Sequence, residues 1–124
     1  MVDLEKIKLK LRSFAKERDW EQFHDPKNLS MALSVEVAEL VEIFQWSKTG
    51  GLDEINNPKI KKEVEREIAD IFNYLIKLVD LMDIDLETAS LNKIDENITK
   101  YPSSEVKGKA IKYKELEKDD PHGS

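Results

Sequence analysis

Four acidic residues form two matching pairs in the chain. The first pair is Glu36-x-x-Glu39, and the second, Glu67-x-x-Asp70, follows after a gap of 27 residues. On an α-helix, residues three positions apart lie on nearly the same face, so each pair would present two carboxylates side by side. Carboxylate oxygens are the ligands that Mg²⁺ and Mn²⁺ prefer. The spacing therefore indicates a divalent-cation site shared by two helices.

The first acid of each pair lies in the middle of an apolar helical stripe. At about 100° per residue, Glu36 and Glu67 are centred among apolar side chains, while Glu39 and Asp70 lie at the edges. The apolar neighbours are Leu29, Ala32, Leu33, Leu40 and Ile43 for the first pair, and Ile60, Val64, Ile71, Tyr74 and Leu78 for the second. Ionised carboxylates that face a core destabilise it unless a cation or a proton compensates them. The alternative is that the acids border the core and point sideways into water, as most charged pairs on helices do.

Several other chemistries are excluded by the residues present. The chain has no cysteine, which excludes disulfides, thiolate zinc sites and a cysteine nucleophile. Its two histidines, His24 and His122, do not supply the Glu-x-x-His pairs on two helices that a di-iron bundle needs. Gly50-Gly51 is not followed by Lys-Ser or Lys-Thr, so no phosphate-binding glycine loop is present.

The elements that must position the acids are predicted to be helices. Apolar residues recur at helical spacing in four segments, at about 3–19, 28–47, 58–82 and 85–101. Asn28 and Asp85 are candidate N-caps, and Pro58 suits the first turn of its helix. The pattern predicts an all-α protein. The length of 124 residues allows one domain, expected over 1–118, with 119–124 as a flexible tail.

Charge and hydropathy limit the partners and the location. The formal net charge of -6 argues against a nucleic-acid polymer as the main partner. The most hydrophobic stretch, 68–82, is interrupted by charged residues, so no membrane span is expected. No targeting segment is recognisable at the start of the chain, and we expect a cytoplasmic protein.

A second apolar face on two of the helices predicts self-association. It comprises Val37 and Val41 on the second predicted helix, and Ile68, Phe72, Ile76 and Val79 on the third. A helix that is apolar nearly all round must be buried nearly all round, and a chain this short has few other segments to cover it. We therefore expect at least a homodimer, with these residues between the subunits.

Aromatic residues near the acids suggest a site for a nucleobase. Trp20 and Trp46 could sandwich a base, because stacking on an aromatic ring binds any base without demanding a sequence. Glu21, Gln22 and His24 could supply hydrogen bonds that distinguish one base edge from another. The alternatives are that the tryptophans fill the core and that His24 is a loop residue satisfied by the backbone.

These residues resemble the MazG-type all-α nucleoside triphosphate pyrophosphohydrolases. The two acid pairs and their separation match the metal-binding signature of that family. Further runs resemble its dCTP pyrophosphatase subfamily, namely Arg18-Asp-Trp-Glu-Gln-Phe-His24, Asn28-Leu29, Phe44-Gln-Trp46, Asp70 with Tyr74, Leu91-Asn-Lys93-Ile-Asp95-Glu-Asn97 and Tyr101-Pro102. The resemblance covers about 4–116, nearly the whole chain.

The resemblance implies a fold, a cofactor and a set of site residues. The fold is a four-helix, bundle-like one, assembled as a homodimer or as a homotetramer of two dimers. The implied Mg²⁺ ligands, with Mn²⁺ as an alternative ion, are Glu36, Glu39, Glu67 and Asp70. The implied substrate-binding residues are Trp20, Glu21, Gln22, Phe23, His24, Trp46 and Tyr74 around the base, and Lys93 and Asn97 near the phosphates. Leu11 stands where family members can carry a histidine, which leaves the base preference open.

The predicted function is Mg²⁺-dependent hydrolysis of dCTP, or a modified dCTP, to the monophosphate and pyrophosphate. An acid not fully used for ligation, Glu36 or Glu39, would act as general base. Lys93 and the segment 99–118, which has six Lys against three Glu, would stabilise charge on the leaving pyrophosphate. Two alternatives remain: the same hydrolysis of dUTP or another non-canonical nucleotide, and a non-catalytic helical dimer that binds a protein.

Overall fold

The computed structural model describes residues 1–109, which contain helices and no strand. The chain divides into two compact units, Met1–Ile84 and Asp85–Ser124. Within the described residues, the first unit contains α1 (Leu4–Glu17), the 3₁₀ helix η1 (Glu21–Phe23), α2 (Pro26–Phe44), α3 (Leu52–Ile55) and α4 (Pro58–Leu81). The second unit contains α5 (Leu86–Lys100) and α6 (Ser103–Val106). The predicted all-α fold class is confirmed.

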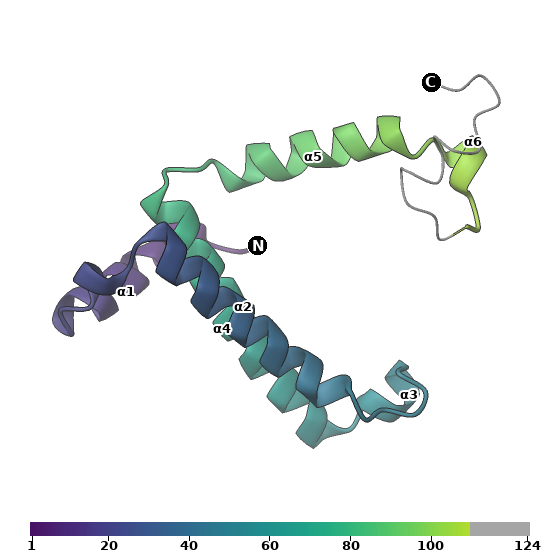
Figure 1. Cartoon of the computed structure of the whole chain (residues 1–124), viewed down its shortest axis with the longest axis horizontal. Helices are drawn as coiled ribbons and strands as arrows, with labels where there is room; N and C mark the ends of the chain where they lie inside the picture. The colour runs from purple at the N-terminus through teal and green to yellow at the C-terminus, as the bar shows by residue number, and fades with distance from the viewer. Residues whose placement is uncertain (110–124) are drawn as a thin grey trace. The chain divides into compact units, whose positions relative to one another are not determined.

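The first unit is built on the pairing of α2 with α4. The two helices run side by side in opposite directions, and α1 packs against α4 (Figure 1). The buried apolar residues among those described are Ala15 of α1, Leu29 of α2, and Ile76 and Val79 of α4. This small core lies where α1, the start of α2 and the end of α4 meet.

The burial of Ile76 and Val79 corrects one sequence-based expectation. Both were expected between subunits, but their exposed fractions are 0% and 4% within the single chain. The reason is that α1 and α2 both pack on α4, so this helix buries two of its faces inside its own unit. Val41 and Ile68, from the same expected face, are 57% and 52% exposed.

Side chains cap the start of each long helix. The carboxylate or amide oxygens of Asp3, Asp25, Asn57 and Asp85 accept a hydrogen bond from a backbone N–H in the first turn. The predicted cap at Asp85 and the place of Pro58 at the start of its helix are confirmed. The predicted cap at Asn28 is wrong, because α2 begins two residues earlier at Pro26, a residue suited to a first helical turn.

Two helices end in the same left-handed motif. After α1, Asp19 has φ 54°, and the Trp20 N–H donates to the Ala15 carbonyl at 2.9 Å. After α4, Asp83 has φ 51°, and the Ile84 N–H donates to the Val79 carbonyl at 3.0 Å. This is the Schellman pattern, in which the residue after the left-handed one is folded back onto the helix. It fixes the position of Trp20 beside α1.

Asp85–Ser124 form the second compact unit. α5 and the short α6 lie in it, and the described part of the lysine-rich segment is partly helical. Residues 110–124, which include the rest of that segment and the expected flexible tail, lie outside the described residues. The four-helix bundle and the single domain over 1–118 therefore stay predictions. None of the described helices is both long enough and apolar enough to cross a membrane.

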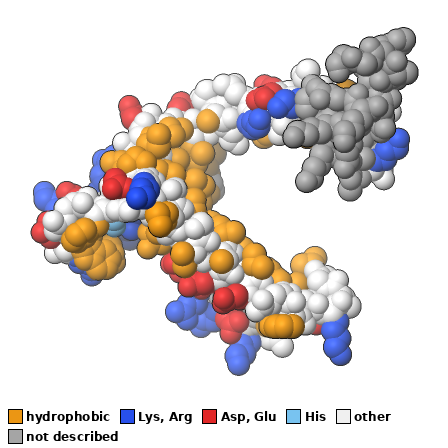
Figure 2. All heavy atoms as spheres, viewed as in Figure 1, with side chains coloured by type: hydrophobic (Ala, Val, Ile, Leu, Met, Phe, Trp, Pro, Cys, Tyr) orange, Lys and Arg blue, Asp and Glu red, His pale blue; other side chains and the backbone are white. Residues whose placement is uncertain are grey.

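Much apolar surface remains exposed on the first unit. Hydrophobic side chains gather along the α2–α4 pair in Figure 2. The exposed large hydrophobic residues of these two helices are Met31, Val35, Val37, Val41, Ile68 and Leu81. Contiguous apolar surface of this kind marks an interaction site on a soluble protein.

Candidate active site

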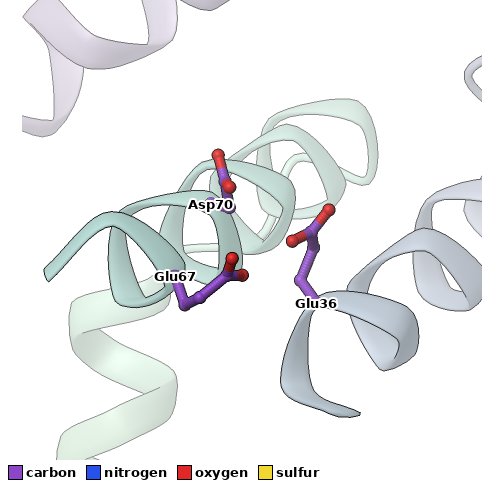
Figure 3. A group of neighbouring side chains, drawn as sticks. All are labelled: Glu36, Glu67 and Asp70. Atoms are coloured by element: carbon purple, nitrogen blue, oxygen red, sulfur yellow. The ribbon is translucent and has the colours of Figure 1, made fainter. Parts of the chain in front are cut away.

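Three carboxylates converge between α2 and α4. Glu36 projects from α2, and Glu67 and Asp70 project from α4 (Figure 3). One oxygen from each of them lies within 4.8 Å of the others. The antiparallel pairing of the two helices brings these groups together, although 31 positions separate Glu36 from Glu67 in the sequence.

Two of these carboxylates hold an oxygen away from solvent without a partner. Oε2 of Glu36 and Oε2 of Glu67 are buried and accept no hydrogen bond from any described residue. Burial, with Glu39 and Glu67 close by, raises the pKa of Glu36 to about 7. Burial also raises the pKa of Glu67 above its usual range. Unpartnered, buried oxygens on neighbouring acids fit a hard divalent cation, which would neutralise their repulsion and accept their lone pairs.

Glu39 lies beside this group and not within it. It lines an open hollow of about 540 Å³ together with Glu67 and Asp70. The other lining residues are Glu42, Ile43, Glu63 and Arg66. The four predicted ligands are thus divided in the structure into a converging group of three and Glu39, which lines the same hollow as Glu67 and Asp70.

A second hollow places aromatic rings next to the acids. It measures about 390 Å³, lies between α1 and α4, and includes Trp20, Tyr74 and Asp70 in its lining. The remaining lining residues are Lys10, Leu11, Phe14, Asn73 and Lys77. Trp20 is 44% exposed and contacts Phe14 edge to face, with 5.7 Å between ring centroids. Because Asp70 lines both hollows, the aromatic pocket adjoins the acidic one.

The segment 21–24 is folded as η1 and a turn. Glu21 and His24 line a smaller hollow of about 260 Å³, which also contains Leu11 and Lys77. Burial, and secondly the charge of Lys77, lower the pKa of His24, so the neutral imidazole is favoured there. Lys77 therefore lines both this hollow and the aromatic one.

Gln22 and Phe23, the other two residues of this segment, are not in the lining of the smaller hollow. Gln22 donates to the backbone carbonyl and to Oδ2 of Asp19, at 3.0 and 3.1 Å, and so supports the turn itself. The Phe23 ring is exposed, and its carbonyl accepts from Nδ2 of Asn28 at 2.9 Å. Asn28, predicted as a helix cap, thus holds the turn that carries these side chains.

The structure does not bring Trp46 to Trp20 within one chain. Trp20 precedes α2 and Trp46 follows it, so the 19 residues of the helix separate them. At 1.5 Å per residue this is about 28 Å, too far for both rings to contact one base. Trp46 is 85% exposed, and the loop after it is held by Glu54, which accepts from the Thr49 N–H at 2.9 Å.

Lys93 and Asn97 lie one turn apart on α5. The Lys93 ammonium is paired with Glu96 at 3.2 Å, and the Asn97 carbonyl accepts from the Tyr101 N–H at 2.8 Å. Both residues belong to the second compact unit. Their predicted contact with phosphates stays a prediction.

Sequence reasoning missed the cationic side chains that line the hollows, of which two lie next to the proposed site. Arg66 lies among the acids of the larger hollow, and Lys77 lines both the aromatic hollow and the smaller one. The signal for Lys77 was present, since it interrupts the most hydrophobic stretch of the chain. By itself, that interruption indicates only that the stretch does not span a membrane.

The fold and site define a family. A model of the MazG-like family matches residues 31–116, so the chain belongs to that family and the predicted resemblance is confirmed. The chain is 40% identical to human dCTP pyrophosphatase 1 over 122 residues, covering 98% of this chain and 69% of the human protein. It is 41% identical to the bovine dCTP pyrophosphatase 1, covering 98% and 70%. A crystal structure of a pyrophosphatase from Archaeoglobus fulgidus is similar, with 40% identity and a TM-score of 0.74 over 82% of this chain and 94% of that one.

Proposed function

We propose that this protein hydrolyses dCTP, or a close analogue, to dCMP and pyrophosphate with the help of a divalent cation. Its relatives over nearly the whole chain are dCTP pyrophosphatases, which supports a nucleotide pyrophosphatase. The observation that carries the proposal is the pair of unpartnered buried oxygens of Glu36 and Glu67 next to an aromatic hollow. Cation-binding groups and a base-sized aromatic pocket in contact are what a nucleoside triphosphate requires.

Three of the four acids would bind the cation, and the fourth would accept a proton. Glu36, Glu67 and Asp70 would hold Mg²⁺, or Mn²⁺ in its place, because their oxygens converge. The ion, when bound, supplies positive charge to the phosphate oxygens. Of the two predicted general bases we favour Glu39, which lines the same hollow and lies outside the converging group. A water oxygen would bond to phosphorus, its proton would pass to Glu39, and the phosphoanhydride bond would break with its electron pair on pyrophosphate.

The base would lie in the aromatic hollow against Trp20 and Tyr74. Trp46 can join this pocket only from a second copy of the chain, since α2 separates it from Trp20. The exposed apolar residues on α2 and α4 favour the same assembly. We therefore propose a homodimer, or a homotetramer of two dimers, in which two chains complete each base pocket. Light scattering coupled to size exclusion tests the assembly, and a monomer at micromolar concentration contradicts it.

On α5, Lys93 and Asn97 would contact the phosphates of the substrate. Their one-turn spacing would let both side chains reach the same group of phosphate oxygens. Lys93 would exchange its present partner Glu96 for the more highly charged pyrophosphate as that group leaves.

The test is a screen of nucleoside triphosphates with Mg²⁺, with released pyrophosphate as the readout. We expect dCTP and its 5-substituted forms to be the preferred substrates. Equal rates of hydrolysis on purine and pyrimidine nucleotides would contradict dCTP as the preferred substrate. A higher rate on dUTP would identify dUTP as the preferred substrate instead. The absence of any Mg²⁺-dependent hydrolysis would favour the alternative of a protein-binding helical dimer.

A matched pair of variants on α4 links the activity to the carboxylates. Glu67→Gln removes one charge from the converging group, whereas Glu65→Gln removes one from an exposed position two residues away. We expect the first to lower kcat by roughly 10²-fold or more, in line with the loss of one catalytic electrostatic group, and the second to leave it unchanged. Equal activity of the two variants would contradict the proposed site.

A further inference from the structure

Lys77 occupies a central position between two hollows of the first unit. It lines the aromatic hollow with Trp20 and Tyr74, and the smaller hollow with Glu21 and His24. Its Nζ lies 5.0 Å from the centroid of the Tyr74 ring and 5.9 Å from that of Phe14. The ammonium is therefore directed among aromatic faces at the wall of the pocket that we propose for the base.

The Lys77 ammonium is only partly compensated. It forms no ion pair with any residue in the described part of the chain, and its partial burial lowers its pKa. Asp80, one turn further along α4, is engaged by Arg12, whose Nε donates to Oδ2 at 2.8 Å and whose Nη2 donates to Oδ1. Aromatic faces stabilise a cation but accept none of its three N–H donors in the way that oxygen or nitrogen does. A ligand that displaces water from this pocket would therefore have to supply acceptors for these donors.

The chemistry of the pocket limits what that ligand is. A flat ring fits against Trp20 and Tyr74, and the edge turned to Lys77 must carry acceptors and no donor. Neutral cytosine has two adjacent acceptors, the carbonyl O2 and the ring nitrogen N3. Uracil and thymine carry an N–H at position 3, which a cation repels, so they offer the ammonium one acceptor fewer.

We propose that Lys77 is a specificity-determining residue, whose ammonium donates hydrogen bonds to O2 and N3 of a cytosine ring lying against Trp20 and Tyr74. The proposal rests on the proposed function, because it assumes that the aromatic hollow holds the base. Beyond that function, it specifies which edge of the base is recognised and which side chain recognises it. Lys77 thereby favours cytosine over uracil nucleotides.

The experiment compares two ligands and two proteins. The ligands are dCMP and 3-deaza-dCMP, in which a C–H replaces N3, and binding is measured by calorimetry. The proteins are the wild type and Lys77→Met, which keeps an unbranched apolar stem of similar length without the charge. We expect the wild type to bind dCMP roughly 10–100-fold more tightly than the deaza analogue, the range for a hydrogen bond to a charged group. The variant should bind the two ligands equally.

The control for charge is Lys61→Met, an exposed position on the same helix, which should discriminate between the ligands as the wild type does. A Lys77→Met variant that keeps the full wild-type discrimination overturns the proposal. If that variant does not fold, the wild-type binding constants still test the proposal. Equal binding of dCMP and 3-deaza-dCMP to the wild type would exclude a hydrogen bond to N3 and overturn it.

Catalytic rates give a second readout, which distinguishes a failure of the proposed role of Lys77 from a failure of the proposed function. Lys77→Met should lower the ratio of kcat/KM for dCTP to that for dUTP by roughly 10-fold or more, mostly through KM. An unchanged ratio in an active variant overturns the role of Lys77 and leaves the proposed function standing. A wild-type protein that neither hydrolyses nor binds any cytosine nucleotide overturns the proposed function itself.

Discussion

Glu36 of α2 and Glu67 of α4 face each other across the helix pair, and each buries one carboxylate oxygen that accepts no hydrogen bond from a described residue. Two acids in this position oppose folding when both are ionised, since neither burial nor repulsion is compensated. The same arrangement is favourable once a cation lies between them. Stability and ligand binding are thus coupled through these two side chains.

The first prediction concerns the pH dependence of stability without metal. The pKa of Glu36 is about 7 in the folded chain, against an ordinary value of 4.5, so the folded protein holds a proton that the unfolded chain releases. The stabilisation from this protonation is full below about pH 4.5 and is lost as the pH rises through about 7. We expect the Tm in EDTA to fall between pH 5 and pH 8, measured by circular dichroism.

A variant isolates this effect from other titrations. His24, whose pKa is lowered by burial, contributes in the opposite direction, because its stability contribution is lost as the pH falls below its ordinary value of 6.5. The readout is therefore the difference in Tm between the wild type and Glu36→Gln, which cannot ionise at this position. The variant should gain several degrees relative to the wild type at pH 8 and little at pH 5. A constant difference across this range would contradict the buried position of Glu36.

The second prediction concerns proton release when the metal binds. A cation favours the ionised carboxylates, so Mg²⁺ must displace the proton held by Glu36 near neutral pH. Calorimetry in buffers of different ionisation enthalpy should give roughly half a proton to one proton released per site at pH 6.5, and almost none at pH 8.5. Release that does not change between these two pH values would show that the ion binds elsewhere.

The residues of the site were accessible to sequence reasoning to different degrees. Glu36, Glu67 and Asp70 could be placed together because helical periodicity puts Glu36 and Glu67 in the middle of the apolar stripes of two helices that must pack, and Asp70 at the edge of one. Periodicity does not say which neighbour covers which face, so Ile76 and Val79 were assigned to a subunit interface although α1 and α2 bury them.

The hydrophobic pattern also did not predict that the two tryptophans are far apart, or which of two nearby residues caps α2. Trp20 and Trp46 are both aromatic and both near the acids in sequence, yet the length of α2 separates them within one chain. Asp25 and Asn28 are both good capping residues three positions apart. Only the position of Pro26 at the first turn distinguishes them, and that choice depends on how the preceding turn folds.

The third prediction follows from the separation of the tryptophans. If each base pocket takes Trp46 from a second chain, Glu67→Gln and Trp46→Ala damage different halves of the same site. Co-refolding equal amounts of the two inactive variants should restore about a quarter of the wild-type activity, because half of random dimers are mixed and each mixed dimer has one intact site of two. Pyrophosphate release measures the outcome.

The control for this mixing is a pair of variants within one set of acids. Glu36→Gln with Glu67→Gln should restore nothing, since both residues come from the same chain in every site. Restoration by the control pair, or its absence in the Glu67→Gln and Trp46→Ala mixture, would each contradict a pocket shared between chains.

The fourth prediction tests the left-handed end of α4. Asp83 has φ 51°, a conformation that disfavours side chains with a Cβ and that glycine adopts freely. Asp83→Gly should therefore stabilise the protein by about 0.5–1 kcal/mol, measured by urea unfolding at a fixed protein concentration. The same replacement inside the helix, Glu65→Gly, should destabilise it by about 1 kcal/mol, because glycine there loses more backbone entropy. Backbone conformation alone predicts changes of opposite sign in the free energy of unfolding for the two variants. A loss of stability in both would mean that the Asp83 side chain itself stabilises the end of α4.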